Sequence, residues 1–115
     1  MVVYPDVDAR LSDDEVDRIF RALADATRRD IVQRTLIEDA SISDLAERYD
    51  MSFAAVQKHI TVLEGAGLVT KHRSGRMRHI RANAQALRKA QGLLQTYERI
   101  WQHRLAQLDA LLAEE

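Results

Sequence analysis

The sequence predicts a mainly α-helical fold with one small β-hairpin, in the order four helices, hairpin, long final helix. Three observations predict it. Between residues 12 and 65, apolar residues recur at helical spacing in four segments, each preceded by a residue that can cap a helix. Residues 68–81 then hold two short segments around a Ser-Gly turn. Residues 83–113 lack proline and repeat apolar residues every seven positions.

The first two helices are predicted from their capping residues. Residues 12–15 (Ser-Asp-Asp-Glu) match a capping box, so the first helix is expected from about Asp13 to Ala24. Its apolar face consists of Val16, Ile19, Phe20 and Leu23. Asp25 can cap the second helix, which is expected to end near residues 37–39. One face of that helix carries Ile31, Val32 and Leu36.

A short third helix and a fourth helix follow, with a break between them. Ser41 or Ser43 can cap the third. Its expected inward face consists of Ile42, Leu45 and Tyr49. Ser52 can cap the fourth helix, and Gly65 and Gly67 provide its stop signal. The expected inward face of the fourth helix consists of Phe53, Val56, Ile60 and Leu63.

The hairpin is expected to turn at Ser74-Gly75 and to direct three apolar residues inward. These residues are Val69, Met77 and Ile80. In the final helix, apolar residues recur every seven positions at Leu87, Leu94, Trp101 and Leu108. Ala90, Tyr97 and Leu111 fill most of the intermediate positions, and Arg104 interrupts them. Such a stripe packs either into the chain's own core or against a partner helix. A chain this small has few other residues that could cover the stripe, which favours dimerisation.

A short helix, a tight turn, a second helix and a basic hairpin together form a winged helix-turn-helix. In this plan the second helix presents its outer face to the major groove of double-stranded DNA, and the hairpin reaches a neighbouring phosphate or the minor groove. The outer face of the fourth helix consists of Ala54, Gln57, Lys58 and Thr61. The fourth helix is therefore the predicted recognition helix.

The predicted DNA contacts differ in their chemistry. Gln57 suits bidentate recognition of adenine and Lys58 suits guanine or a phosphate, although phosphate contact or plain exposure are alternatives for both. Ala54 can touch only a thymine methyl group, and Thr61 is more simply explained by plain exposure. Ser52, at the helix N-terminus, can bind a phosphate. His59 either contacts a phosphate or packs beside Ile60.

The charge distribution supports the same reading. The net charge is −1, but residues 51–81 hold six basic residues and only one acid, Glu64. The hairpin contributes Lys71, Arg73, Arg76, Arg78 and Arg81. A merely solvated hairpin rarely carries charge of a single sign. Arg76, next to the turn, is the expected minor-groove or phosphate contact.

Composition limits the remaining possibilities. The 115 residues, with 46% hydrophobic and 30% charged residues, suit one globular domain over residues 1–115. Within it, residues 11–81 are the expected DNA-binding core and wing, and residues 83–113 the dimerisation helix. Cysteine is absent, which removes disulfides, thiolate metal sites and thiol redox sensing. With no leader pattern at the start and no apolar run of about 20 residues, a cytoplasmic location without membrane contact is expected.

Neither an enzyme nor a metalloprotein is predicted. The G-x-S-x-G, H-E-x-x-H and glycine-rich phosphate motifs are missing, and no cofactor is expected. His72 and His79 can face each other across the hairpin, but two ligands do not make a metal site. A winged-helix protein-interaction module without DNA binding is the competing function, and the basic segment argues against it.

Several segments resemble a known family. Residues 18–31 look like the opening signature of ArsR-type regulators, and residues 42–46, 55–60 and 62–69 resemble their helix-turn-helix. The resemblance covers roughly residues 16–112. It implies a homodimeric winged-helix regulator that often represses its own operon, with the first and last helices at the dimer interface. The residues assigned to that interface are Val16, Ile19, Phe20, Leu94, Tyr97, Trp101, Leu105 and Leu108.

Two departures from the family pattern matter. Ala26 stands where many relatives carry proline, which affects only the start of a helix. The cysteine-containing metal box of the family is absent around residues 41–45, and residues 97–105 resemble a metal-independent branch. An unidentified small organic effector, a protein partner, or autoregulation without any effector therefore remain as alternatives.

Overall fold

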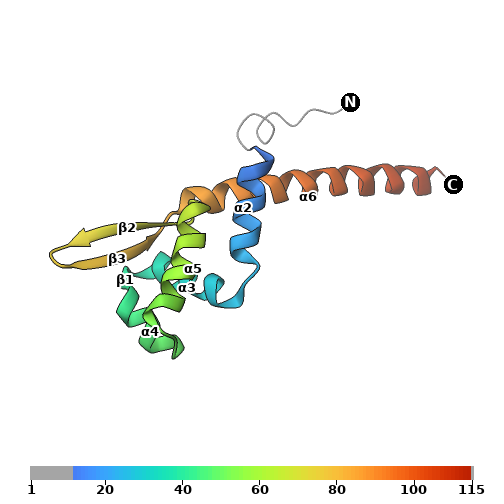
Figure 1. Ribbon diagram of the computed structural model, residues 1–115. Coiled ribbons are helices and arrows are strands. Elements are labelled where there is room, and N and C mark those ends of the chain that lie inside the picture. The colour runs from blue at the N-terminus through green and yellow to red at the C-terminus, as the bar shows by residue number, and fades with distance from the viewer. Residues whose placement is uncertain (1–11, 115) are drawn as a thin grey trace.

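The computed structural model describes residues 12–114 and contains the predicted order of helices and hairpin, with one additional short strand (Figure 1). The elements are α2 (Asp13–Leu23), α3 (Ala26–Ile37), β1 (Ala40–Ser41), α4 (Ile42–Tyr49), α5 (Phe53–Gly65), β2 (Val69–Ser74), β3 (Met77–Ala82) and α6 (Ala84–Ala113). The chain is thus mainly helical with a small hairpin, as predicted. The expected absence of a leader segment concerns residues outside the described part.

The predicted capping residues begin the helices. The side chains of Ser12, Asp25, Ser41 and Ser52 each accept a hydrogen bond from the backbone N–H three residues later. Of the two serines considered for α4, Ser41 is therefore the cap. Each such bond satisfies a backbone donor that the helix itself leaves unpaired, which stabilises a helix start by about 1 kcal/mol.

The hydrophobic core forms around α5. Val56, Ile60 and Leu63 on its inward face are fully buried, together with Ile31 of α3 and Ile80 of β3. Three residues expected in or beside the core lie elsewhere: Phe53 is 56% exposed, Met77 51% and Leu36 49%. Each of them stands at an end of its element. The periodicity identified the correct face of the helix or strand but not the point at which the core ends.

The sheet has three strands in the order β1-β3-β2, all antiparallel. Ala40 pairs with Ile80, so the two-residue β1 completes the sheet beside β3. It was not predicted, because two residues are too short to show an alternating pattern. Ser74 pairs with Met77 and belongs to β2, so the turn lies at residues 75–76, one position later than predicted. Gly75 has φ +63°, which glycine adopts without strain.

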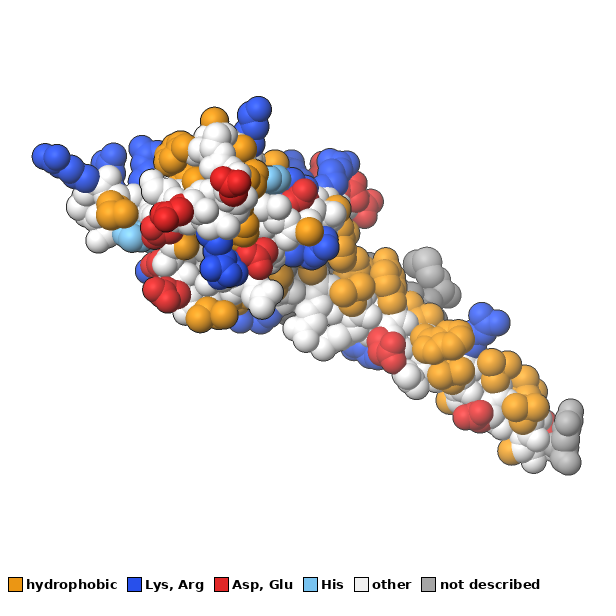
Figure 2. Space-filling model, turned by 90° about the horizontal axis from the view of Figure 1, so that it is seen from below, with side chains coloured by type: hydrophobic (Ala, Val, Ile, Leu, Met, Phe, Trp, Pro, Cys, Tyr) orange, Lys and Arg blue, Asp and Glu red, His pale blue; other side chains and the backbone are white. Residues whose placement is uncertain are grey.

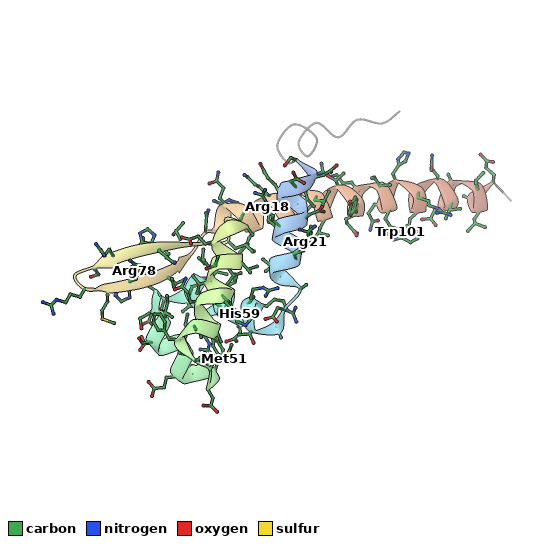
Figure 3. All side chains as sticks on the ribbon, in the orientation of Figure 1. Arg18, Arg21, Met51, His59, Arg78 and Trp101 are labelled. Carbon is green, nitrogen blue, oxygen red and sulfur yellow. The ribbon has the colours of Figure 1, made fainter. Side chains whose placement is uncertain are left out.

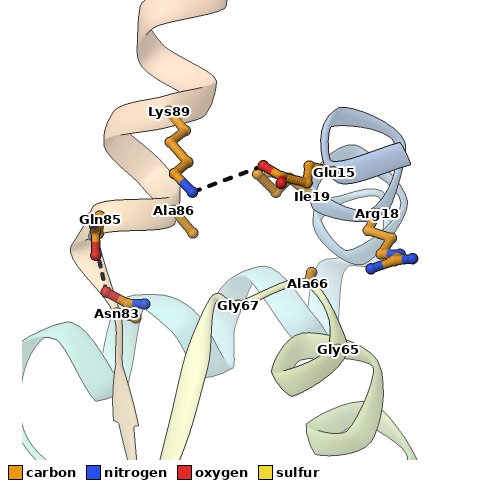
Figure 4. A pocket seen from close by; sticks show the side chains of 10 residues that line it. All are labelled: Glu15, Arg18, Ile19, Gly65, Ala66, Gly67, Asn83, Gln85, Ala86 and Lys89. Atoms are coloured by element: carbon orange, nitrogen blue, oxygen red, sulfur yellow. Dashed lines mark hydrogen bonds and ion pairs between the residues drawn. The ribbon is translucent and has the colours of Figure 1, made fainter. Parts of the chain in front are cut away.

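The connection from α5 to β2 lines a pocket together with the starts of α2 and α6 (Figure 4). Gly67 has φ +74°, and the N–H of Leu68 donates to the carbonyl of Leu63 (2.9 Å), which closes the helix in a Schellman-type turn. Only Asn83 separates β3 from α6; its N–H donates to the carbonyl of Leu68 (2.8 Å) and its side chain caps α6. Helix α5, the hairpin and helix α6 therefore meet at one place.

Helix α6 leaves the body of the protein after crossing α2 (Figure 1). Ala86 and Ala90 in its first turns are buried, and Leu87 packs against the core. Thirty residues correspond to a helix about 45 Å long, so much of α6 projects beyond the other elements. Among residues 12–114, no helix has the length and apolar character needed to cross a membrane.

Candidate nucleic-acid interface

The outer face of α5 is open to solvent. Ala54, Lys58 and Thr61 are exposed and Gln57 is half-buried, as expected for a recognition helix. The Thr61 hydroxyl donates to the backbone carbonyl of Gln57 (2.9 Å), and the Gln57 amide Nε2 donates to the Thr61 oxygen (3.4 Å). The Gln57 side chain therefore lies along the helix surface. Its second amide hydrogen and its carbonyl oxygen make no hydrogen bond with the described residues.

Helix α4 is fixed to α3 through a buttress of three polar side chains. The Tyr49 hydroxyl donates to Asp30 Oδ2, and Arg34 Nε donates to the same oxygen (2.7 Å). These two hydrogen bonds lower the pKa of Asp30, whereas burial, followed by the hydrogen bond to Asp30, raises the pKa of Tyr49 to about 12. The buttress stays in one charge state at neutral pH and sets the position of α4, which braces α5.

His59 lies inward from the exposed face of α5, and its side chain is only 20% exposed. Its Nδ1 is 3.4 Å from Arg28 Nη1 and 4.0 Å from Asp25 Oδ2. Arg28 in turn donates to the carbonyl oxygens of Ala22 (2.7 Å) and Arg21 (2.9 Å) at the end of α2. His59 thus joins the recognition helix to the turn between α2 and α3 and is not grouped with Lys58 and Thr61.

The hairpin cations fall into two groups. Near the base, Lys71 Nζ is 3.7 Å from Glu64 of α5, and Arg81 makes a bidentate ion pair with Asp39, whose pKa it lowers. Nearer the tip, Arg73, Arg76 and Arg78 are exposed and have no carboxylate within 4 Å among residues 12–114. The tip arginines are therefore available to an outside anion, while the two basal cations hold the hairpin in place.

A hollow separates the hairpin tip from the starts of α4 and α5. Its walls are formed by Ser41, Ile42, Ser43, Phe53, Gln57, Arg76, Met77 and Arg78. It therefore joins the predicted base-reading glutamine to the predicted wing arginines in one continuous surface. Phe53 and Met77 line this hollow, although their positions in the sequence pattern predict that both lie in the core. Phe53 is the first residue of α5 and Met77 lies beside the turn, and residues at the ends of elements are the ones that the core is least able to cover.

The histidines of the hairpin do not form a metal site. His72 faces His79 across the two strands, as expected, and His72 Nε2 is 2.8 Å from the Thr70 hydroxyl oxygen. Asp39 lies near both rings but is engaged by Arg81. Within residues 12–114, no group of three or more potential ligands is arranged to hold a metal ion.

The residues expected at a dimer interface are divided between core and surface. Ile19 is buried in the chain's own core, Val16 and Leu105 are half-buried, and Phe20 is exposed. Large apolar side chains are exposed along α6, where they form a hydrophobic strip (Figure 2). Its members are Leu94, Tyr97, Ile100, Trp101, Leu108, Leu111 and Leu112. Trp101 and Arg78 lie on opposite sides of the helical body (Figure 3).

Comparison with known proteins identifies relatives of the helix-turn-helix region. A family model described as a helix-turn-helix domain matches residues 23–72. The uncharacterized HTH-type transcriptional regulator YuzN of Bacillus subtilis (strain 168) is 40% identical over 80 residues, covering 63% of this chain and 86% of that protein. The transcriptional repressor SdpR of the same organism is 28% identical over 72 residues, covering 63% of this chain and 80% of that protein.

The similarity extends to solved structures. An ArsR-like transcriptional regulator from Rhodococcus sp. RHA1 superposes with a TM-score of 0.78 at 33% sequence identity. The match covers 88% of this chain and 93% of that one. The shared architecture thus includes the helix-turn-helix, the hairpin and much of the flanking helices.

Proposed function

Because this chain belongs to the ArsR family of winged helix-turn-helix transcriptional regulators, we propose that it binds an inverted-repeat operator as a homodimer and represses transcription. Family membership makes the chain a DNA-binding regulator and not an enzyme. The dimer, the operator type and the repressing role are the proposal. So are the individual contact residues.

The observation that carries the proposal is the continuous surface from the outer face of α5 to the hairpin tip. Lys58 on α5 and three tip arginines place positive charge on this surface, where the described residues do not neutralise it. Phosphate neutralisation supplies much of the affinity of such proteins for DNA, and base-edge contacts supply the sequence preference. Gln57, at the edge of the hollow, has a second amide hydrogen and a carbonyl oxygen that make no hydrogen bond with the described residues and that match the N7 and N6 groups of adenine.

The exposed strip on α6 supports the homodimer. Leu94, Tyr97, Trp101, Leu108 and Leu111 follow a heptad spacing that Arg104 interrupts once. A strip of this size is rarely left in water and suits a helix from a second copy. Two copies related by a two-fold axis would present two recognition helices to successive major grooves, about 34 Å apart.

Repression follows from the same geometry. A dimer that occupies both half-sites of a promoter excludes other proteins from that stretch of duplex, and a relative is itself named a transcriptional repressor. Because the family often controls its own operon, the chain's own promoter is the first target to test. No metal or other cofactor is part of the proposal.

The test is selection of DNA from a random duplex library by the purified protein, followed by binding measurements at fixed salt. The selected sites should contain an inverted repeat, bind with nanomolar affinity and lower expression of a reporter placed downstream. Gln57→Ala should reduce the ratio of specific to non-specific affinity, because it removes base contacts and leaves phosphate contacts. Gln91→Ala, an exposed glutamine on α6, is the matched control.

Failure to enrich any sequence would contradict the DNA-binding proposal and favour a protein-interaction module. Enrichment of a site without two-fold symmetry would contradict the homodimer on an inverted repeat. A rise in reporter expression would exclude the repressing role alone. If Gln57→Ala weakened binding to every DNA sequence equally, the proposal that Gln57 contacts a base would be contradicted.

A further inference from the structure

Resting on the proposed function, we propose that Phe53 contacts the C5 methyl group of a thymine in each operator half-site. This thymine lies next to the base read by Gln57. Phe53 thereby becomes a specificity-determining residue, although the helical pattern had placed it in the core. Three features of the structure carry the inference: the exposure of the ring, its position relative to Gln57, and the charges around it.

The Phe53 ring is largely exposed and lies outside the hydrophobic core of the described residues. The side chain is 56% exposed at the first residue of α5 and does not belong to the hydrophobic core. An exposed phenyl ring contributes little to stability, because most of its apolar surface remains in water. Exposed aromatic side chains beside polar groups are typical of recognition surfaces.

Phe53 and Gln57 are neighbours on the surface of α5. Residues four positions apart lie one above the other on the same face of a helix, and both residues line the hollow that separates α5 from the hairpin tip. A glutamine that binds adenine in the major groove therefore places Phe53 about one base step away on the same wall of the groove. At that position the aromatic ring faces base edges.

The surroundings of Phe53 identify the chemistry of its partner. Arg76 and Arg78 line the same hollow, so the occupant must carry negative charge and also offer an apolar group. In the major groove of DNA, the apolar group on the base edges is the thymine methyl, and phenylalanine is among the residues that contact it. Met77, 51% exposed in the same hollow, extends the apolar wall toward the hairpin.

The experiment replaces thymine by uracil, which lacks only the methyl group, at one thymine at a time within both half-sites of the selected operator. For the unmodified protein, uracil at one symmetric position should weaken binding about fourfold per half-site, the effect of leaving one methyl group in water. Phe53→Ala should bind the thymine and uracil forms equally. Phe53→Leu should retain part of the difference.

Val62→Ala is the matched control. Val62 is also an exposed apolar residue of α5, but nine residues from Phe53 it lies on the opposite side of the helix. This variant should keep the full preference for thymine. Circular dichroism and thermal unfolding check that Phe53→Ala folds; Phe53→Gln, which keeps a long side chain without the ring, provides a second variant that should lose the preference.

Two outcomes would overturn this inference alone. The first is an operator in which no thymine-to-uracil change weakens binding by the unmodified protein. The second is a Phe53→Ala variant that still distinguishes thymine from uracil; a uniform loss of affinity with this preference intact would instead indicate contact with deoxyribose. In both cases the protein still selects a specific site. Failure to select any DNA would overturn the proposed function together with the inference.

Discussion

At the scale of single residues, polar side chains determine how the helix-turn-helix is held together. Asp30 accepts hydrogen bonds from Tyr49 and Arg34, and His59 lies between Arg28 and Asp25. These contacts join helices that are separated in sequence, so they fix the angle at which α5 is presented. Helical periodicity could not predict them, because spacing along one helix carries no information about polar partners on another.

The bond between Tyr49 and Asp30 makes stability depend on pH. Asp30 has a pKa below its ordinary value of 3.8 in the folded state, so it contributes stability that is complete above about pH 5 and decreases as the pH falls through the folded pKa. Tyr49→Phe removes one hydrogen bond and should lower the free energy of unfolding at pH 7 by about 1 kcal/mol. It should also make the loss of stability on acidification less steep.

Urea denaturation at fixed protein concentration between pH 3 and pH 7 measures both effects. Ser74→Ala, which removes an exposed hydroxyl of β2 that makes no hydrogen bond with the described residues, is the control and should change neither quantity. Equal stability of Tyr49→Phe and the unmodified protein across this range would show that the hydrogen bond from Tyr49 to Asp30 contributes nothing to folding.

At the scale of elements, helix boundaries and the hairpin follow from local chemistry, and the ends of the core do not. The caps of four helices could be read from the sequence because a serine or aspartate beside an apolar run satisfies backbone donors within the same segment. The strand β1 and the exposure of Phe53 and Met77 depend on neighbouring elements. The outer face of α5 was therefore predictable residue by residue, but the hollow beside it was not.

The hairpin tip should contribute phosphate contacts to DNA binding. Replacing both Arg76 and Arg78 by alanine removes two cations that no described carboxylate neutralises. The slope of log affinity against log salt should therefore become shallower by about one to two units per half-site. Fluorescence anisotropy at several salt concentrations measures it. Arg88→Ala, an exposed arginine of α6, is the control, and an unchanged slope in the double variant would show that the tip does not reach the phosphates.

At the scale of the whole molecule, the two predicted surfaces lie far apart. The hairpin points away from one side of the helical body and α6 projects from the other (Figure 1). The heptad repeat of α6 was visible in the sequence, but the repeat alone left open whether it packs into the chain's own core. The structure divides it: Leu87 and Ala90 pack inward, whereas Leu94, Trp101 and Leu108 are exposed.

Dimerisation should depend on this exposed part of α6. Trp101→Glu places a charge within the apolar strip, and burying an unpaired carboxylate in a helix–helix interface is unfavourable. The variant should be monomeric in analytical ultracentrifugation at concentrations where the unmodified protein is dimeric, and it should bind a single half-site only weakly. His103→Glu introduces the same residue outside the heptad positions and should remain dimeric. A dimeric Trp101→Glu variant would place the interface elsewhere.

The single residue between β3 and α6 has a mechanical consequence. Asn83 caps α6 and its N–H donates to the carbonyl of Leu68, so the base of the hairpin is joined directly to the start of the long helix. In a dimer built on α6, a small change in the crossing angle of the paired helices would be amplified into a larger change in the span between the two wings. A molecule that binds between the paired helices and separates them would change the spacing of the two wings, so that it no longer matches the helical repeat of DNA. It would do so without contacting the residues proposed to bind the bases.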